Sequence, residues 1–414
     1  MATRKIPNHP NTNKNNLKGK QNSMATATIP HLPVLVIHHV LQFLPTKLAI
    51  RMSSLCKQWE GLWSSVPVLD FEEEDEHAKF INFVDRCLEI HEKYEHLDKF
   101  RLHMGSCSFG DKNKFNKWLG FAVERRVKEL DISFSYRHPV LGVTLLLPLL
   151  NAKSITSLNL ENVTIANRGC PCIQYLSLTS SSSSDYYIIS MQNLLDAKYL
   201  TSLNLEFVQI TDDSNNDPPI GRLPCLKTVS LTTVNMHYGT FAQLISSSPS
   251  LEHLSVSIFF PHYFISPHIL PSSSLKSFEV GIFNSDVVQV SGAESLESCT
   301  LVLESPKQIK CIRLDGCKNL KHLSIRAPPL PNFTLQLHGC KHLVNASLDI
   351  PKLYFTRISS NVEWRNFYSL ANYLGKFQSF ENISLYVDDA EMAEAIKEEL
   401  ERHANKGKYD KLQI

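Results

Sequence analysis

One short pattern, apolar-x-x-apolar-x-apolar, recurs along most of this 414-residue chain. It occurs in runs such as Leu97/Phe100/Leu102, Val127/Leu130/Ile132, Leu200/Leu203/Leu205 and Phe380/Ile383/Leu385. Successive runs mostly start about 20 to 30 residues apart, which is the period of leucine-rich repeats. The last two apolar residues of each run alternate with polar ones, as in a half-buried strand. The pattern therefore predicts stacked coils, about a dozen of them, whose strands form one parallel sheet.

The segments between the runs predict what covers the other side of that sheet. Residues 76–91 and 111–126 carry apolar stripes at helical spacing, so helices are expected behind the first strands. Further along, Ile309/Ile312/Leu314, Leu335/Leu337 and Leu353/Phe355 lie midway between the main runs, which indicates strands there instead. The predicted fold class is α/β: a short helical module, then a solenoid with a parallel concave sheet and helices, followed by strands, on its convex side.

Residues 29–71 match no repeat and predict a separate helical module. Leu35, Ile37, Val40, Leu41 and Leu44 recur at helical spacing as a stripe that a helix would bury, and Pro45 ends that helix. A second helix or helix pair is indicated by Leu48, Met52, Leu55, Trp59, Leu62 and Trp63. So small a module rarely stabilises itself, which suggests that its remaining apolar surface contacts a partner.

These residues resemble a plant-type F-box, and residues 71–387 resemble the leucine-rich region of plant F-box/LRR proteins. The resemblance implies that the module binds a Skp-family adaptor and thereby joins an SCF-type cullin-RING ubiquitin ligase as its substrate receptor. The adaptor-binding residues it implies are Ile29, Leu32, Pro33, Ile37, Leu41, Leu44, Pro45, Lys47, Leu55, Trp59 and Trp63. Val34 and Gln58 depart from the family pattern, at positions that are often acidic and usually basic, respectively.

Four segments are expected from these patterns. Residues 1–28 hold five basic side chains, no acidic one and few apolar ones, which predicts a disordered basic tail. The F-box spans 29–71 and the solenoid 72–387. Residues 388–414 are expected to form a capping helix and a tail, because an apolar face there would cover the last open coil.

Composition and motifs exclude several classes of function. With 42 basic and 41 acidic residues the net charge is +1, so no broad field for nucleic acid is expected. Neither a signal peptide nor an apolar run long enough to span a membrane is evident, which predicts an intracellular protein of the nucleus, the cytoplasm or both. Phosphate loops, metal-ligand pairs and nucleophile motifs are likewise not found. We therefore expect no catalytic residue, cofactor or metal, and ubiquitin chemistry would be performed by partner subunits.

The polar positions of each run should line the concave face, where solenoids commonly bind proteins. The candidate substrate-binding residues are Glu129, Asp131, Asn159, Glu161, Tyr175, Asn204, Glu206, Ser230, His253 and Ser255. The four carboxylates among them motivate the hypothesis of a basic substrate segment.

Two other functions stay open on the sequence alone. The chain would act as a binding scaffold if its divergent F-box recruits no ligase. A third alternative is a small-molecule receptor of the auxin-receptor kind, for which the array looks short.

Overall fold

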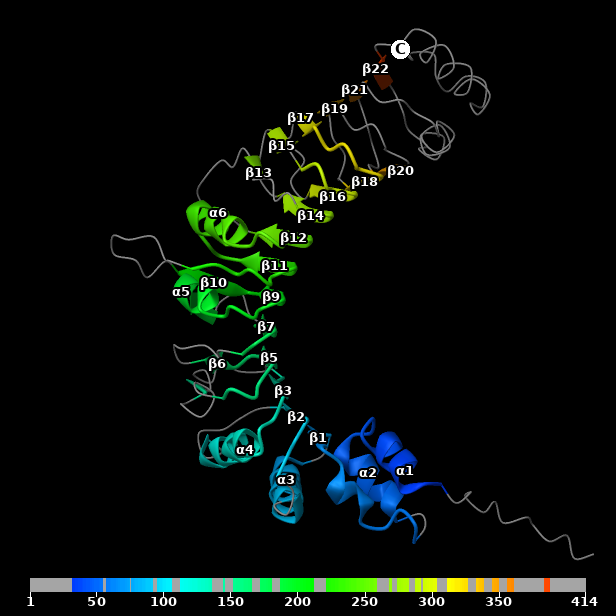
Figure 1. The fold of residues 1–414 in the computed structure, drawn as a ribbon, viewed down its shortest axis with the longest axis vertical. Coiled ribbons are helices and arrows are strands. Elements are labelled where there is room, and N and C mark those ends of the chain that lie inside the picture. Colours follow the sequence, from blue (N-terminus) through cyan, green and yellow to red (C-terminus); the bar gives the residue numbers. More distant parts are fainter. Residues whose placement is uncertain are drawn as a thin grey trace, which may run out of the picture.

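The protein forms an open arc with a small helical module at its N-terminal end (Figure 1). The computed structural model describes residues 32–54, 57–74, 76–91, 95–105, 112–135, 144–145, 152–165, 172–180, 187–211, 221–258, 268–269, 274–282, 287–291, 293–303, 311–326, 333–338, 345–349, 356–360 and 383–387. The expected N-terminal tail and the expected C-terminal helix lie outside these ranges.

The N-terminal module, residues 32–66, contains helices α1 (Val34–Leu41) and α2 (Thr46–Ser53) and the 3₁₀ helix η1 (Leu62–Ser65). Each α-helix begins directly after a proline, a residue tolerated at helix starts because the missing N–H would have no intrahelical partner there. Ile37 and Leu41 are buried as predicted.

The predicted stripe on α1 is wrong for two members, since Leu35 is 81% and Val40 is 38% exposed. Leu48, which opens the second pattern, is also 43% exposed, and Leu55 lies outside the described residues. The reason is that α1 spans only eight residues and packs mainly against η1. A single row of its side chains, Ile37 and Leu41, is enough to form this contact, and the other apolar side chains stay outside it. A partly apolar outer surface remains.

The concave side of the arc is a parallel sheet in the order β1-β2-β3-β5-β7-β9-β11-β12-β14-β16-β18-β20. Its strands are β1 (Val68–Glu72), β2 (Lys99–Met104), β3 (Glu129–Phe134), β5 (Ser157–Glu161), β7 (Tyr175–Thr179), β9 (Ser202–Glu206), β11 (Thr228–Val234), β12 (His253–Ile258), β14 (Ser277–Ile282), β16 (Ser298–Leu303), β18 (His322–Arg326) and β20 (Asn345–Asp349). Each predicted run from Leu97 to Leu348 lies at one of these strands. The predicted parallel concave sheet is confirmed.

The convex side changes from helices to strands along the chain, as the sequence predicts. Behind the first strands lie α3 (His77–His91), α4 (Lys112–Glu124), α5 (Met191–Leu195) and α6 (Tyr238–Ser246), with the short pairs β4 (Thr144–Leu145)/β6 (Thr164–Ile165) and β8 (Tyr187–Ser190)/β10 (Val208–Thr211). A second parallel sheet follows, formed by β13 (His268–Ile269), β15 (Val287–Ser291), β17 (Cys311–Asp315), β19 (Phe333–His338), β21 (Thr356–Ser360) and β22 (Ile383–Val387).

The last predicted run belongs to a different sheet than expected. Ile383 and Leu385 lie in β22, which pairs with β21 of the second sheet and not with the concave sheet. Both sheets are parallel and alternate in the same way, so the sequence pattern of a strand does not reveal which sheet it joins.

One continuous hydrophobic core runs from Ile37 in the N-terminal module to Ile325 in β18. At the junction, Phe71 of β1 packs edge-to-face against Phe83 of α3 and Phe100 of β2, with ring centroids 6.0 Å apart in both pairs. The module is thus packed onto the first coil by shared apolar burial. Among the helices described, none has the length and hydrophobicity needed to cross a membrane.

A buried histidine also ties the first convex helix to the chain entering β1. His91, at the end of α3, is fully buried, and its Nε2 donates a 3.0 Å hydrogen bond to the carbonyl of Val66. Burial lowers the pKa of His91, and the nearby charge of Arg125 lowers it further, although the bond to Val66 acts in the opposite direction. The imidazole is therefore neutral in the folded protein at neutral pH.

This burial predicts an acid-sensitive junction. Because the unfolded chain takes up the His91 proton near pH 6.5 and the folded chain only at lower pH, the free energy of unfolding should fall as pH drops below about 6.5. His91→Gln keeps a donor for Val66 but cannot titrate, so urea unfolding between pH 8 and 5 should show a smaller pH slope. A pH slope for His91→Gln equal to that of the wild-type protein would contradict the prediction.

Candidate docking surfaces

Parallel, in-register pairing places the polar positions of the concave strands in rows across the sheet. One row runs through Asp131, Asn159, Ser177, Asn204, Ser230 and Ser255. Neighbouring members are separated by about 4.8 Å, the spacing of paired strands. All ten predicted substrate-binding residues lie on strands of this sheet, and none is buried. Ser133 and Ser177, also expected to face outward, are only 7% and 4% exposed.

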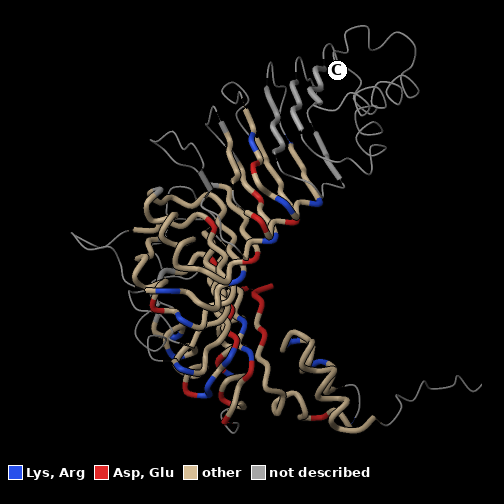
Figure 2. The backbone as a smooth tube through the Cα atoms, turned by 45° about the horizontal axis from the view of Figure 1, so that its top comes forward, with Lys and Arg blue, Asp and Glu red and all other residues tan. Residues whose placement is uncertain are grey.

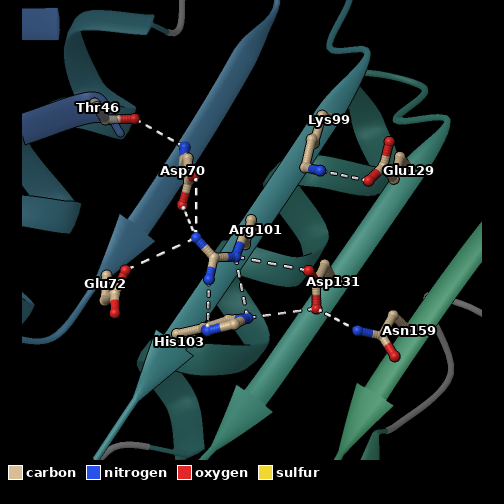
Figure 3. Close-up of polar contacts among 9 residues, drawn as sticks. All are labelled: Thr46, Asp70, Glu72, Lys99, Arg101, His103, Glu129, Asp131 and Asn159. Atoms are coloured by element: carbon tan, nitrogen blue, oxygen red, sulfur yellow. Dashed lines mark hydrogen bonds and ion pairs between the residues drawn. The ribbon is translucent and has the colours of Figure 1, made fainter. Parts of the chain in front are cut away.

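At the N-terminal end of this face, polar side chains bind one another in what we call the Arg101 network, comprising Asp70, Glu72, Arg101, His103, Asp131 and Asn159 (Figure 3). Arg101 Nη1 lies 3.1 Å from Asp70 Oδ1 and 3.8 Å from Glu72 Oε2, while Arg101 Nε lies 3.7 Å from Asp131 Oδ2. These contacts join three adjacent strands, so a single cation offsets the charge of several carboxylates.

On β3, Asp131 connects Arg101 and His103 of β2 with Asn159 of β5. Its Oδ1 accepts a 2.9 Å hydrogen bond from Asn159 Nδ2 and lies 3.5 Å from His103 Nε2. Burial alone would raise the pKa of Asp131, but the hydrogen bonds from His103 and Asn159 and the positive charge of Arg101 outweigh it, so the pKa is lowered. The carboxylate is thus held ionised and engaged within the protein.

The remaining predicted carboxylates differ in their availability to a partner. Glu129 lies 2.5 Å from Lys99 Nζ, and Glu161 accepts a 2.5 Å hydrogen bond from Ser133. Glu206, on β9, has no ion pair with any described residue. Charged residues of both signs follow one another along the arc (Figure 2). The acidic character that the sequence suggests is therefore partly neutralised at Glu129 and Asp131 and left to Glu161 and Glu206.

The second surface is an exposed apolar patch on the N-terminal module. It consists of Val34 (50% exposed), Leu35 (81%), Val36 (42%), Val40 (38%), Phe43 (72%) and Leu48 (43%). These side chains project from α1, from the turn after it and from α2. Exposed apolar side chains gathered on one small module are typical of an interaction site.

The implied adaptor-binding residues fall into distinct environments. Ile37, Leu41, Trp59 and Trp63 are buried inside the module, Leu32, Leu44, Pro45 and Lys47 are half-buried, Pro33 is exposed, and Ile29 and Leu55 lie outside the described residues. The buried four can shape the module but present no surface to a partner. The sequence suggests an apolar partner-binding surface on this module but does not identify these residues as its exposed members, although they interleave with the predicted ones in α1.

Gln58, one of the two departures from the family pattern, holds the start of α1 in place. Its side-chain amide donates to the carbonyl of Leu32, and its Oε1 accepts a 3.4 Å hydrogen bond from the Leu32 N–H. Val34, the other departure, is 50% exposed and contributes to the apolar patch. Both substitutions thus fit the structure of the module.

Thr46 is a further residue that the sequence analysis missed. It begins α2, is only 3% exposed, and its Oγ1 accepts a 2.8 Å hydrogen bond from the backbone N–H of Asp70 in β1. Helical spacing singles out apolar residues, and a threonine beside a proline gives no such signal. The contact is visible only once α2 and β1 are placed side by side (Figure 3).

Two buried cysteines and the titratable side chains are the candidates for reactive or metal-binding chemistry among the described residues. Burial raises the pKa of the Cys87 thiol to about 12, and burial also raises the pKa of Cys299, so both thiols stay protonated. Within the same part of the chain, His, Cys, Asp and Glu form no group of three or more that could hold a metal ion. The concave sheet and the exposed apolar patch are both surfaces of a kind that can bind other proteins.

Comparison with known proteins agrees with these two parts. Residues 29–71 match the F-box domain model, and residues 172–351 match the model described as FBD-associated F-box protein At5g56370, LRR repeats. Neither model describes an enzyme family.

The chain also resembles proteins of Arabidopsis thaliana. It is 30% identical over 172 residues to FBD-associated F-box protein At1g66310, covering 39% of this chain and 37% of that protein. For F-box/FBD/LRR-repeat protein At5g56420 the identity is 32% over 155 residues, covering 36% and 35%. For FBD-associated F-box protein At5g56370 it is 28% over 238 residues, covering 56% and 54%. The matches span about a third to a half of these relatives' lengths.

The Arg101 network predicts a measurable stability cost. Arg101→Met should leave Asp70 and Asp131 half-buried without their cation and lower the free energy of unfolding by about 1–3 kcal/mol at pH 7. Chemical denaturation followed by circular dichroism measures this loss. The matched control is Lys128→Met, because the Lys128–Asp98 pair is 67% and 52% exposed; it should cost at most about 1 kcal/mol. An equal cost for both variants would refute the assigned role.

Proposed function

Because the chain is a plant-type F-box/LRR-repeat protein, we propose that it is the substrate-recognition subunit of an SCF-type cullin-RING ubiquitin ligase. The observation that carries this proposal is the exposed apolar patch of α1 and α2 within the segment that matches the F-box model. The patch binds a Skp-family adaptor, and the protein acts in the nucleus, the cytoplasm or both. The chain itself contributes no catalytic residue.

The arrangement of the two surfaces supports this function. The N-terminal module lies at one end of the arc, on the side toward which the concave sheet opens (Figure 1). A protein bound in the arc is thereby held near whatever binds the module. Holding two reactants together raises their effective concentration, so a non-catalytic subunit accelerates transfer by proximity.

The concave sheet is the proposed substrate surface, and its charge suggests the substrate class. On β1 to β9 its outward positions carry Asp70, Glu72, Glu129, Asp131, Glu161 and Glu206 against two cations, Lys99 and Arg101. Both cations are already engaged by carboxylates of the same face. A substrate segment rich in Lys and Arg complements the excess negative charge.

The adaptor contact is testable with the apolar patch. Leu35→Asp/Phe43→Asp places charges at two of its most exposed positions and should weaken binding of a purified Skp-family adaptor by at least about tenfold, since each buried apolar side chain contributes about 1.5–3 kcal/mol. Isothermal titration calorimetry measures this change. Ile90→Asp, 47% exposed on α3, is the control and should bind normally.

Failure of the wild-type protein to bind any Skp-family adaptor would refute the ligase function. Retained binding by a Lys/Arg-rich peptide in that case would favour the alternative, a leucine-rich binding scaffold without a ligase.

The substrate class is testable with Glu161 and Glu206, because reversing Glu129 or Asp131 would also break internal ion pairs. Glu161→Lys/Glu206→Lys should weaken binding of a fluorescent Lys/Arg-rich peptide by about tenfold, with weaker salt dependence than wild type. Fluorescence anisotropy at two ionic strengths measures both effects. The control Glu89→Lys/Glu95→Lys makes the same change in net charge at exposed sites outside the concave sheet. If both variants lose affinity equally, the attraction is unspecific and the proposed substrate class is wrong.

A further inference from the structure

Among the described strands, β1 stands at the end of the concave sheet and pairs with β2 alone. It pairs with β2 from Val68↔Lys99 to Glu72↔His103, and the Glu73 N–H continues this pairing by donating to the His103 carbonyl. The other edge of β1 faces the N-terminal module (Figure 1). An unpaired edge exposes backbone N–H and C=O groups that need partners when they are buried.

Thr46 supplies one such partner. Thr46 is the first residue of α2, and the N-cap position before it is occupied by Pro45, so the Thr46 side chain does not stand at the capping position. Instead Thr46 Oγ1 accepts the 2.8 Å hydrogen bond from Asp70 N at the free edge of β1. The side chain is nearly inaccessible to solvent, at 3% exposure, so water does not readily replace it.

The Asp70 side chain extends this contact into the concave face. Its two carboxylate oxygens lie 3.1 Å and 3.3 Å from Arg101 Nη1, and Arg101 in turn contacts Asp131, which binds Asn159. A continuous line of polar contacts therefore leads from α2 through β1, β2 and β3 to β5 (Figure 3). Helix α2, which carries part of the apolar patch, is linked directly to the surface proposed to hold the substrate.

Two other polar contacts between described residues at the junction constrain the angle of α2 less. The ion pair between Lys47 Nζ and Glu74 Oε2 spans 3.1 Å, but its side chains are 30% and 64% exposed and contribute little. The His91–Val66 bond fixes the chain before β1 and does not involve α2. Apolar packing is non-directional, whereas a buried hydrogen bond fixes both distance and direction.

We propose that Thr46 is a positioning residue that fixes the orientation of the apolar patch relative to the concave sheet. Its consequence for ubiquitin transfer rests on the proposed function, because it requires an adaptor on the patch and a substrate in the arc. The orientation itself depends on neither partner. Small misplacements of reacting groups cost large factors in rate, so Thr46 influences transfer without contacting either partner.

Double electron–electron resonance on the full chain tests the orientation directly. Nitroxide labels are attached through ketone-bearing residues introduced at the exposed positions Glu60 and Arg222, which leaves the native cysteines unmodified. Thr46→Val keeps the side-chain shape but removes the acceptor, and should give a distance distribution about twofold wider than wild type. Thr46→Ser keeps the hydroxyl and should restore the narrow distribution.

Two further variants, Thr46→Ala and Ser54→Ala, provide a replacement for Thr46→Val and a control. Thr46→Ala removes the same acceptor but lets water approach the Asp70 amide, so it serves if Thr46→Val does not fold, and should also widen the distribution. Ser54→Ala is the control, because among the described residues the Ser54 hydroxyl bonds only to the nearby Arg51 carbonyl. Unchanged distributions in the folded Val or Ala variant would overturn the proposal.

A transfer assay separates this proposal from the proposed function. With adaptor and substrate affinities unchanged, folded Thr46→Val should ubiquitylate a bound Lys/Arg-rich model substrate about tenfold more slowly, and Thr46→Ser should recover the rate. Equal rates in Thr46→Val and wild type would overturn its role in transfer. A wild-type chain that binds no adaptor would refute the ligase function, whereas the resonance measurement would still decide whether Thr46 orients the module.

Discussion

Mutual burial between neighbouring coils is the constraint on which this structure depends. Each coil presents leucines such as Leu158 and Leu160 on one side of a strand, and these are buried in the common core where β5 lies between β3 and β7. Since hydrophobic stabilisation scales with the apolar area removed from water, a coil with one neighbour buries less than a coil with two. The ends of the array therefore need other elements, and the described N-terminal end uses the helical module for this purpose.

Because the helical module covers the first coil, the module and the solenoid are structurally interdependent. The segment that matches the F-box model extends to residue 71 and so includes most of β1, the first strand of the concave sheet. Phe71 packs against both Phe83 and Phe100, and Thr46 completes a backbone hydrogen bond of the same strand. A partner bound to the module therefore meets a surface whose support comes partly from the first coil.

The sequence predicts the repeat well because period and alternation are properties of the backbone, shared by every coil. It predicts the exposure of individual side chains less well, because exposure depends on which other segments of the folded chain pack against them. Leu35 and Ile37 have similar hydrophobicity and lie two positions apart, yet one is 81% exposed and the other is fully buried. Likewise Glu129 and Glu206 look alike in the sequence, but only Glu129 has a lysine beside it on the adjacent strand. Cross-strand pairing across some 30 residues decides such cases.

The same cross-strand pairing divides the concave face into two regions with different side-chain chemistry. From β1 to β3, carboxylates and cations satisfy one another, which stiffens the end of the sheet that adjoins the module. From β5 onward the rows are dominated by small polar side chains such as Asn204, Ser230 and Ser255, which have shorter reach and leave the face open. Because desolvating paired carboxylates is costly, a chain bound over the Arg101 network would gain less free energy than one bound beyond it. The charged end of the arc is thus internally paired, and Glu161 and Glu206 are the first carboxylates beyond it.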